Sequence, residues 1–383
     1  MKRMPAGRGR ALSLIAGVGL LGATLVSAGP SGAAGTTPNK GLQAARAAVA
    51  KAEATPTKIG VTTPLRKKAP TGKTIAYLQC DVDTCVNQRQ GMEAATKAIG
   101  WTLKVIPFAL ANPATLITAM NQALQYNPVA VYFTSLPYAT WSSEVPVYAK
   151  AGVALIPGFI GPGPIDQTVI ANIEGPTPVT QPGTAEAGSW LADWIISNSD
   201  GHADTLFQSI PGLEVLAAYQ SGFTSTYKKN CPTCKLTIVD FTTAQATASA
   251  MNSVTESRLQ TNPGIHYVVA DNGSFVDGLP SVLKTAGLTD VKIVGESPGP
   301  EQSEGVKTGN PQFGPWVGQA QIYSGWLAVD IALRHLEGMS FAPSDGGLTH
   351  QLLTKATIGD PSLPFNEPKG YPAQFEKLWG VGR

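Results

Sequence analysis

Charged residues are scarce in this chain of 383 residues, at 14% of the total, which is roughly half the usual share. Lys and Arg number 28 against 26 Asp and Glu, giving a formal net charge of +2. Eight of the basic residues precede residue 60, so the rest of the chain has no basic excess with which to bind nucleic acid. The composition therefore argues against a DNA or RNA partner, while the length suits two or three domains.

Motifs for catalysis, cofactors and metals are missing as well. The chain has no G-x-S-x-G elbow, no H-E-x-x-H, no P-loop and no Gly-rich dinucleotide fingerprint. Its four histidines are scattered, at positions 202, 266, 335 and 350, whereas a structural zinc would need four ligands. Asp166 and Glu174 could be close in space, but nothing in the sequence brings them together. We therefore expect no catalytic residue, no cofactor and no metal, and the protein is not expected to be an enzyme.

The first 34 residues have the features of an export signal. A basic head from Lys2 to Arg10 precedes the apolar stretch 11–28, and small residues at 31–34 offer a cleavage site. A retained membrane anchor is the alternative, but three glycines weaken a stretch that is already short for spanning a bilayer. No cysteine lies near it to be acylated as in a lipoprotein, and no later segment could span a membrane. The mature protein is expected to be secreted or extracytoplasmic in the cell envelope, and peripheral to the membrane.

Residues 35–72 are predicted to form a tether. An Ala-rich helical patch at 42–54 is followed by Pro56, Pro64, Pro70 and a basic cluster at 66–68. Together these residues have no periodic apolar face that could pack. The segment could hold the body of the protein off a surface, or it could be a disordered leader without a specific role.

From Lys73 onward, the chain alternates strand and helix patterns. Short apolar runs predict strands, and longer runs with apolar residues three and four apart predict helices. This alternation is typical of α/β proteins with a parallel sheet wound on both faces, and it restarts near residue 185, so we predict two such lobes. The predicted strands are 74–79, 101–108, 129–134, 153–156, 205–208, 236–241, 266–270 and 291–295, and the predicted helices are 88–99, 113–126, 144–151, 185–197, 213–226, 246–261 and 275–286.

Several segments of these lobes carry a family resemblance. They are Lys73–Leu78, Gly91–Trp101 and Asn127–Tyr132 in the first lobe, and His266–Asn272, Leu283–Gly287, Val291–Gly295, Val317–Gln319 and Gly325–Asp330 in the second. In the order and spacing of these segments, the chain resembles the type I periplasmic binding proteins, the ribose-binding-like solute receptors of ABC importers. The resemblance implies a monomer whose two lobes close on a small-molecule ligand by hinge motion, with the permease subunits of an importer as partners.

The resemblance also implies how the lobes are divided. The chain should cross between them near 172–176, near 319 and near 348–352. The N-terminal lobe would then hold 73–172 and 320–347, and the C-terminal lobe 173–319 and 348–383. Ligands of open α/β sheets bind beyond the carboxyl ends of the strands. The loops expected at the ligand are therefore 79–87, 134–141, 157–164, 209–213, 271–275, 296–299 and 319–323.

Individual ligand contacts follow from the same resemblance. Asn272 and Gln319 match amides that bond the sugar in sugar-binding members, since an amide offers both a donor and an acceptor to hydroxyls. The charged clamp of those members is replaced by Phe159 with Ile160 and by Tyr219, and Ser297 stands where an Asp is expected. The cleft should therefore be less charged and more apolar, which favours a ligand with a sizeable apolar face over a simple sugar. The other candidates for the lining are Tyr138, Trp141, Phe275, Asp81 and Asp83, with core packing the alternative for each aromatic and solvated loop positions the alternative for the two acids.

Four cysteines form two close pairs, Cys80 with Cys85 and Cys231 with Cys234. In an exported protein, each pair is expected to be a disulfide. The first would make the cleft-facing loop rigid and so preorganise Asp81 and Asp83 beside the ligand. The C-x-x-C spacing of the second could instead mark a redox pair, although it precedes a strand and does not begin a helix. The alternative to a solute receptor is therefore an extracytoplasmic thiol oxidoreductase, or another enzyme that uses Cys231 and Cys234.

Overall fold

The computed structural model describes residues 40–161, 163–174, 183–247, 250–341 and 347–381. The expected signal at 1–34 and the start of the expected tether lie outside the described residues. Among the described residues, no helix combines the length and the apolar character needed to cross a bilayer.

The first lobe is built on a four-stranded parallel sheet with strand order β2-β1-β3-β4. Successive residues of β1 point to opposite faces, so Ile75 and Tyr77 enter one apolar cluster while Ala76 and Leu78 enter another. Helix α2 covers the first of these faces, and α3 and α5 cover the second. The four strands predicted for this lobe are confirmed. Its elements are β1 (Thr74–Gln79), α2 (Asp83–Ile99), β2 (Thr102–Pro107), α3 (Ala114–Leu124), β3 (Ala130–Thr134), α4 (Tyr138–Trp141), η1 (Ser142–Glu144), α5 (Val145–Ala151) and β4 (Ala154–Gly158).

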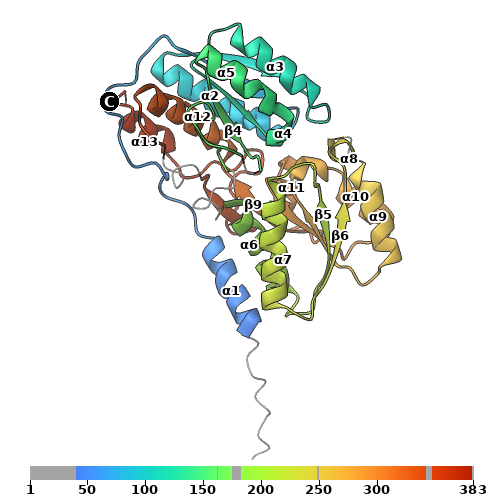
Figure 1. Cartoon of the computed structure of the whole chain (residues 1–383). Coiled ribbons are helices and arrows are strands. Elements are labelled where there is room, and N and C mark those ends of the chain that lie inside the picture. Colours follow the sequence, from blue (N-terminus) through green and yellow to red (C-terminus); the bar gives the residue numbers. More distant parts are fainter. Residues whose placement is uncertain (1–39, 162, 175–182, 248–249, 342–346, 382–383) are drawn as a thin grey trace, which may run out of the picture. The chain divides into compact units, whose positions relative to one another are not determined.

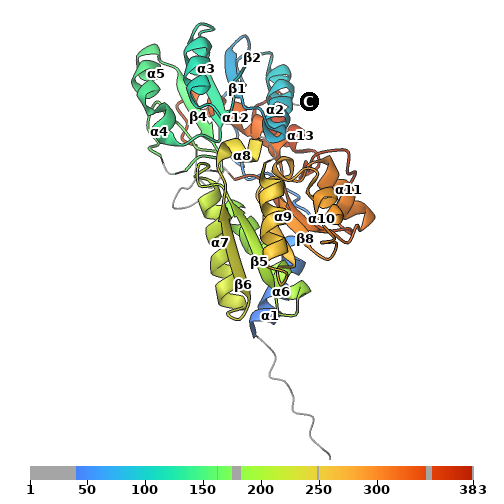
Figure 2. The same ribbon diagram turned by 90° about the vertical axis from the view of Figure 1, so that its right-hand side faces the viewer.

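The second lobe has a six-stranded sheet with strand order β10-β9-β8-β7-β5-β6. Its strands are parallel except for β10, which pairs antiparallel with β9. Helices α6 and α7 lie on one face of the sheet, and α9 and α10 lie on the other (Figures 1 and 2). The elements are α6 (Gly183–Asn198), β5 (Asp204–Ser209), α7 (Leu216–Asn230), β6 (Lys235–Asp240), α8 (Thr243–Thr247), α9 (Met251–Thr261), β7 (Tyr267–Ala270), η2 (Gly273–Phe275), α10 (Leu279–Thr285), β8 (Lys292–Glu296), α11 (Pro300–Thr308), β9 (Phe313–Gln319) and β10 (His350–Leu353).

The sequence prediction of this lobe is confirmed for four strands and incomplete elsewhere. Strand β9 and helix α11 were not predicted. The single helix predicted at 246–261 is two elements in the described part, because α8 ends at Thr247 and α9 begins at Met251. The helix predicted at 275–286 begins later, because Asn272 caps the short turn η2 by accepting a hydrogen bond from the Ser274 amide.

Helix α12 (Gln321–Leu336) returns the chain to the first lobe, where it packs on α2. The two helices approach closely at Gly91 and Gly325. A Cβ on Gly91 would overlap the carbonyl oxygen of Ile322, and one on Gly325 would overlap the backbone of α2. Glycine at both positions is therefore what lets α12 complete the core of the first lobe.

Residues 40–72 do not form the unpacked tether that was predicted. Helix α1 (Lys40–Ala52) lies against α6 and α7 of the second lobe (Figure 1), with Ala45 and Ala52 fully buried. Its small residues permit this contact, since Gly41 meets the backbone of Asn230. The chain then runs to the first lobe, where four apolar side chains are buried: Ile59, Val61, Leu65 and Ala69. Residues 53–73 form no helix or strand, so only their tertiary contacts place these side chains in the core.

Part of the C-terminal segment packs on the first lobe, whereas all of it was predicted to belong to the second. Strand β10 lies in the second lobe as expected, but helix α13 (Tyr371–Leu378) packs on α12 of the first lobe. Trp379 stacks on Trp326, with ring centroids 5.4 Å apart, and its indole nitrogen donates to buried Asp330 at 2.8 Å. The assignment of all of 348–383 to the second lobe is therefore wrong, because burial of these aromatic rings on α12 decides where the tail lies.

Candidate functional site

Two adjoining cavities lie where the loops of the two lobes meet. The inner cavity has a volume of about 70 Å³ and the outer about 310 Å³. Both are lined by Thr84, Asn272, Ser297, Gln319 and Gln321, so they form one continuous cleft.

The position of the cleft follows from the strand order. In each sheet the order reverses beside the first strand of the lobe, between β1 and β3 and between β5 and β7. Loops that leave the carboxyl ends of these strands diverge and leave a crevice. Each of the seven loops expected at the ligand supplies at least one residue to the inner cavity. These residues are Val82, Thr84, Ser135, Phe159, Leu213, Asp271, Asn272, Phe275, Glu296, Ser297, Gln319 and Gln321.

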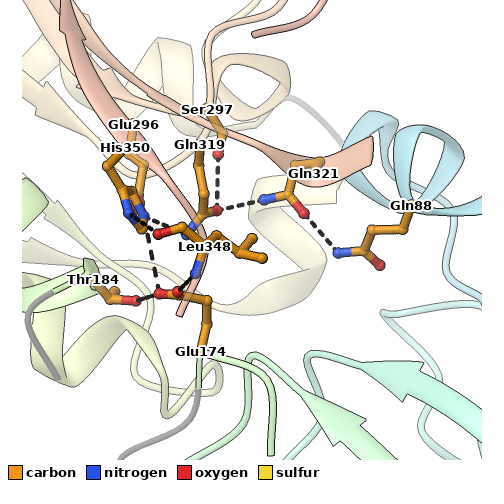
Figure 3. Close-up of polar contacts among 9 residues, drawn as sticks. All are labelled: Gln88, Glu174, Thr184, Glu296, Ser297, Gln319, Gln321, Leu348 and His350. Atoms are coloured by element: carbon orange, nitrogen blue, oxygen red, sulfur yellow. Dashed lines mark hydrogen bonds and ion pairs between the residues drawn. The ribbon is translucent and has the colours of Figure 1, made fainter. Parts of the chain in front are cut away.

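A directed chain of hydrogen bonds runs through the floor of the cleft, from the first lobe to the crossing segments (Figure 3). The Tyr77 hydroxyl donates to Gln88 Oε1 at 2.8 Å, and Gln88 Nε2 donates to Gln321 Oε1 at 2.7 Å. Gln321 then donates to Gln319 Oε1, and Gln319 Nε2 lies 2.9 Å from His350 Nε2. An amide nitrogen can only donate, so this His350 nitrogen is the acceptor.

That direction fixes the state of His350. Its Nδ1 lies 3.1 Å from the carbonyl oxygen of Leu348 and donates to it, so the ring is the neutral Nδ1–H tautomer. Burial lowers the pKa of His350 to about 4, which agrees with the neutral ring. The contacts of His350 with Glu174 at 3.9 Å and with Glu296 at 3.8 Å are therefore not ion pairs at neutral pH.

Glu174 ties two of the crossing segments together. Its carboxylate accepts hydrogen bonds from the Leu348 amide and from the Thr184 hydroxyl, so it joins the end of the first crossing to the third and to the start of α6 (Figure 3). The carboxyl is fully enclosed, and burial raises its pKa to about 7 although both hydrogen bonds oppose the rise. The crossing segments are thus joined by buried polar groups whose hydrogen bonds are satisfied within the protein.

Two further carboxyls line the inner cavity. Asp271 follows β7 directly, and Glu296 is the last residue of β8. Burial raises the pKa of Asp271 to about 7 and that of Glu296 well above its usual range, with Asp271 and Glu174 adding repulsion at Glu296. The expectation of a cleft with few charged groups thus overlooked two ionisable side chains at its inner end, which directly precede Asn272 and Ser297 in their loops.

Five of the eight predicted ligand residues do line the cleft: Asn272, Ser297, Gln319, Phe159 and Phe275. Asn272 Oδ1 accepts from the amide and the hydroxyl of Ser274, so a ligand would meet its amide nitrogen. Gln319 is engaged on both sides of its amide by the hydrogen-bond chain described above. The Ser297 hydroxyl lies 3.5 Å from Gln319 Oε1.

The other three lie elsewhere. Tyr219 is fully buried and its hydroxyl donates to the Ala270 carbonyl at 2.8 Å. It lines neither cavity of the cleft, although it borders a third cavity, of about 600 Å³, that shares Asp271 with the inner one. Tyr138 packs edge-on against Trp141 and lines neither cavity. Asp81 accepts a hydrogen bond from the Leu110 amide at 2.9 Å and so fixes a neighbouring loop. Core packing was the alternative for the two tyrosines and a solvated loop position the alternative for Asp81, which is exposed.

Both cysteine pairs are disulfides in the structure, Cys80–Cys85 and Cys231–Cys234. The first joins the loop after β1 to the start of α2, next to the lining residue Thr84. The second follows the end of α7, with Cys231 buried. Among the described residues, no group of three or more His, Cys, Asp or Glu side chains is arranged to hold a metal ion.

Sequence reasoning missed the segment 361–365, which lines the outer cavity beside the N-terminal turn of α2. Nothing in its composition marks a ligand contact, because its prolines are equally typical of a connecting tail. Asp271 and Glu296, by contrast, could have been found. Each stands at the carboxyl end of a strongly apolar strand, where an ionisable side chain has little access to water.

Comparison with known proteins bears on this geometry. No curated protein sequence matches the chain. Among solved structures, a 5-methylthioribose transporter solute-binding protein from Thermotoga lettingae, in complex with 5-methylthioribose, is 16% identical with a TM-score of 0.65, covering 82% of this chain and 100% of that one. An ABC sugar transporter subunit from Rhodobacter sphaeroides is 19% identical with a TM-score of 0.63, covering 75% and 99%. A solute-binding protein from Mycobacterium smegmatis with bound glycerol is 14% identical with a TM-score of 0.64, covering 77% and 100%.

These similarities show the fold, two α/β lobes of the periplasmic binding protein type. The sequence itself matches the family described as "Periplasmic binding protein domain" over residues 74–340, which include both sheets up to the end of β9. The chain belongs to the periplasmic binding protein family.

Proposed function

We propose that the protein is an extracytoplasmic solute-binding protein, which captures a small ligand in the cleft between its lobes and delivers it to the permease subunits of an ABC importer. The observation that carries this proposal is the convergence of seven loops, from both lobes, on one pair of adjoining cavities. Membership of the periplasmic binding protein family supports it. So do the structural neighbours, which are described as transporter solute-binding proteins.

Export and a monomeric state are part of the same proposal. The basic head and the apolar stretch at 11–28 would direct export. A monomer suffices because residues of one chain line the whole cleft. The protein would then meet its importer at the outer face of the membrane.

Ligand binding should be visible as thermal stabilisation. A ligand that binds only the folded protein, present at a hundred times its Kd, adds about 2.7 kcal/mol to the free energy of unfolding. We expect such a shift from at least one compound in a screen of sugars, polyols, aromatic acids and amines. A screen in which no compound raises the melting temperature would contradict the proposed function.

Asn272→Ala tests where the ligand binds, because the Asn272 amide lines both cavities. We expect affinity to fall by about tenfold, the loss of one hydrogen bond in a desolvated site. Asn121→Ala is the matched control, since Asn121 is exposed on α3 and its amide bonds only the backbone of its own helix. Equal affinities in the two variants would place the ligand outside this cleft.

The thiol oxidoreductase is not favoured. A redox-active C-x-x-C pair lowers its thiol pKa at the start of a helix, whereas Cys231 and Cys234 follow the end of α7 and precede β6. Titration of thiols before and after mild reduction tests this alternative. Reversible cycling of Cys231–Cys234 under conditions that leave Cys80–Cys85 intact would revive it.

A further inference from the structure

Acidic side chains supply all the formal charge in the lining of the cleft. Asp271 and Glu296 line the inner cavity, and Asp83 lines the outer one. A third cavity, of about 600 Å³, adjoins them through Asp271 and is lined in part by Glu214 and Asp240. None of the described residues that line these three cavities is Lys or Arg. This bias is local, because the whole chain carries nearly equal numbers of acidic and basic residues.

The two innermost carboxyls are held away from water. Asp271 is 8% exposed and Glu296 is 4% exposed. Glu296 Oε1 is fully buried and has no hydrogen-bond partner. A buried acceptor without a partner lowers the stability of the protein, and more so when it is ionised. A ligand group that donates to Glu296 and Asp271 would recover this free energy, so the orphaned oxygen itself points to a ligand.

Among the residues that the structure describes, the neighbours of this acid pair provide no compensating positive charge. His350, 3.8 Å from Glu296, is neutral and already donates its only ring N–H to Leu348. Beyond His350 lies Glu174, a third acid. The Tyr219 hydroxyl, which also lies near the pair, donates to the Ala270 carbonyl. The one charge that could balance an ionised pair must therefore come with the ligand.

We propose that the ligand of this protein is a small organic cation, such as an amine or a quaternary ammonium compound, whose charged group enters the inner cavity and pairs with Asp271 and Glu296. The proposal rests on the solute-binding function and names the class of the solute. A volume of about 70 Å³ suits a charged head of a few heavy atoms, while the outer cavity of about 310 Å³ takes the rest of the molecule. The rings of Phe159 and Phe275 line the same inner cavity, and aromatic faces attract cations.

A neutral polyol would bind to the acid pair in a different protonation state. Its hydroxyls could bond to the acid pair in protonated form, so its binding would leave the protonation of the pair unchanged. A cation instead favours the ionised pair and displaces protons from it. Because burial raises the pKa of Asp271 to about 7, a cation should bind more weakly as pH falls from 8 to 5, approaching tenfold per pH unit for each proton displaced.

The experiment compares matched probes of nearly equal shape on the exported protein. The pairs are choline with 3,3-dimethyl-1-butanol, benzylamine with benzyl alcohol, and glucosamine with glucose. Thermal shift at pH 8 and pH 5 selects the pairs that bind, and calorimetry in two buffers of different ionisation enthalpy counts the protons released. We expect the cationic member of at least one pair to bind tenfold or more tightly than its neutral partner at pH 8, with proton release.

Two variants test whether the cation binds to Asp271 and Glu296. Asp271→Asn and Glu296→Gln keep the shape of each side chain and should each weaken the cation by tenfold or more. Asp204→Asn is the control, because Asp204 begins β5 at the end of the sheet opposite the cleft. Circular dichroism and melting temperature check that each variant folds, and either of the two cleft variants suffices for the test.

Several outcomes would overturn the proposal. The proposal is wrong if the neutral member of each pair binds as tightly as its cationic partner. It is also wrong if the affinity for the cation changes neither with pH nor in either cleft variant. In both cases a ligand still binds the protein, so the solute-binding function stands. If no cationic probe binds while simple sugars do, the ligand class is again wrong and the function is right. Only the absence of any ligand in the broader screen contradicts the function.

Discussion

Asp271 illustrates at the scale of a residue how a site for ligand can reduce the stability of the empty protein. Its carboxyl is buried at the end of β7, and burial raises its pKa to about 7 from an unfolded value of roughly 3.9. Between these two values the folded protein binds the proton more tightly than the unfolded chain does. The free energy of unfolding therefore falls as pH rises through this window. At neutral pH Asp271 therefore lowers the stability of the folded protein.

The variant Asp271→Asn should remove this pH-dependent loss of stability. One pKa unit corresponds to about 1.4 kcal/mol, so we expect the gain of the variant over the wild type to be about 2–3 kcal/mol larger at pH 8 than at pH 5. Chemical denaturation at the two pH values, without ligand, measures it. Asp204→Asn serves again as the control. A gain that is equal at both pH values would mean that Asp271 ionises normally in the folded protein.

Tyr219 shows the opposite case, a residue that looks like a ligand contact and packs in the core. Its hydroxyl bonds the Ala270 carbonyl within the second lobe. Tyr219→Phe should cost about 1 kcal/mol of stability, the net value of one buried hydrogen bond. It should leave the affinity for any ligand found in the thermal screen unchanged. A tenfold loss of affinity in a folded Tyr219→Phe protein would return this residue to the site.

At the scale of elements, glycines decide how closely helices approach. Gly91 of α2 lies against the backbone of α12, and no side-chain movement can make room for a Cβ there. Gly91→Ala should therefore destabilise the protein by about 2 kcal/mol or more, through separation of two packed helices, despite the better helix propensity of alanine. Gly359→Ala is the matched control because nothing lies within 4 Å of its Cβ position. Equal melting temperatures for the two variants would contradict the close packing of α2 on α12.

The elements also show what the sequence could and could not predict. Strands such as β3 and β7 are buried on both faces, so their apolar runs stand out locally, and the loops at the cleft follow from the parallel order of the strands. Segments 59–69 and 361–365 were missed because they are extended and irregular, and only their tertiary contacts determine where they lie. Tyr219 was assigned to the cleft and Asp271 was overlooked, because a family pattern does not say which side chain points into the cleft.

At the scale of the whole molecule, the first and the last described helices each pack on the opposite lobe from the strand that adjoins them. Helix α1 packs on the second lobe although β1 follows in the first, and α13 packs on the first lobe although β10 precedes it in the second. Two further segments therefore cross between the lobes, in addition to the three expected. The segment between α1 and β1 is hydrogen-bonded to both lobes. Gln351 of β10 donates to the Glu53 carbonyl at 2.8 Å, and Arg334 of α12 donates to the Thr63 carbonyl at 2.6 Å.

These additional crossings should couple the unfolding of the two lobes. We expect a chain that begins at residue 39 to unfold in a single calorimetric transition, with equal van't Hoff and calorimetric enthalpies. A chain that begins at residue 56 loses α1 but keeps the residues buried on the first lobe. Removal of α1 uncovers apolar side chains of α6 and α7, so the second lobe should lose about 2 kcal/mol and unfold first, splitting the transition. Hydrogen exchange should then show β5 to β10 opening before β1 to β4. Identical melting of the two chains would mean that α1 adds nothing to the second lobe, as expected of a tether.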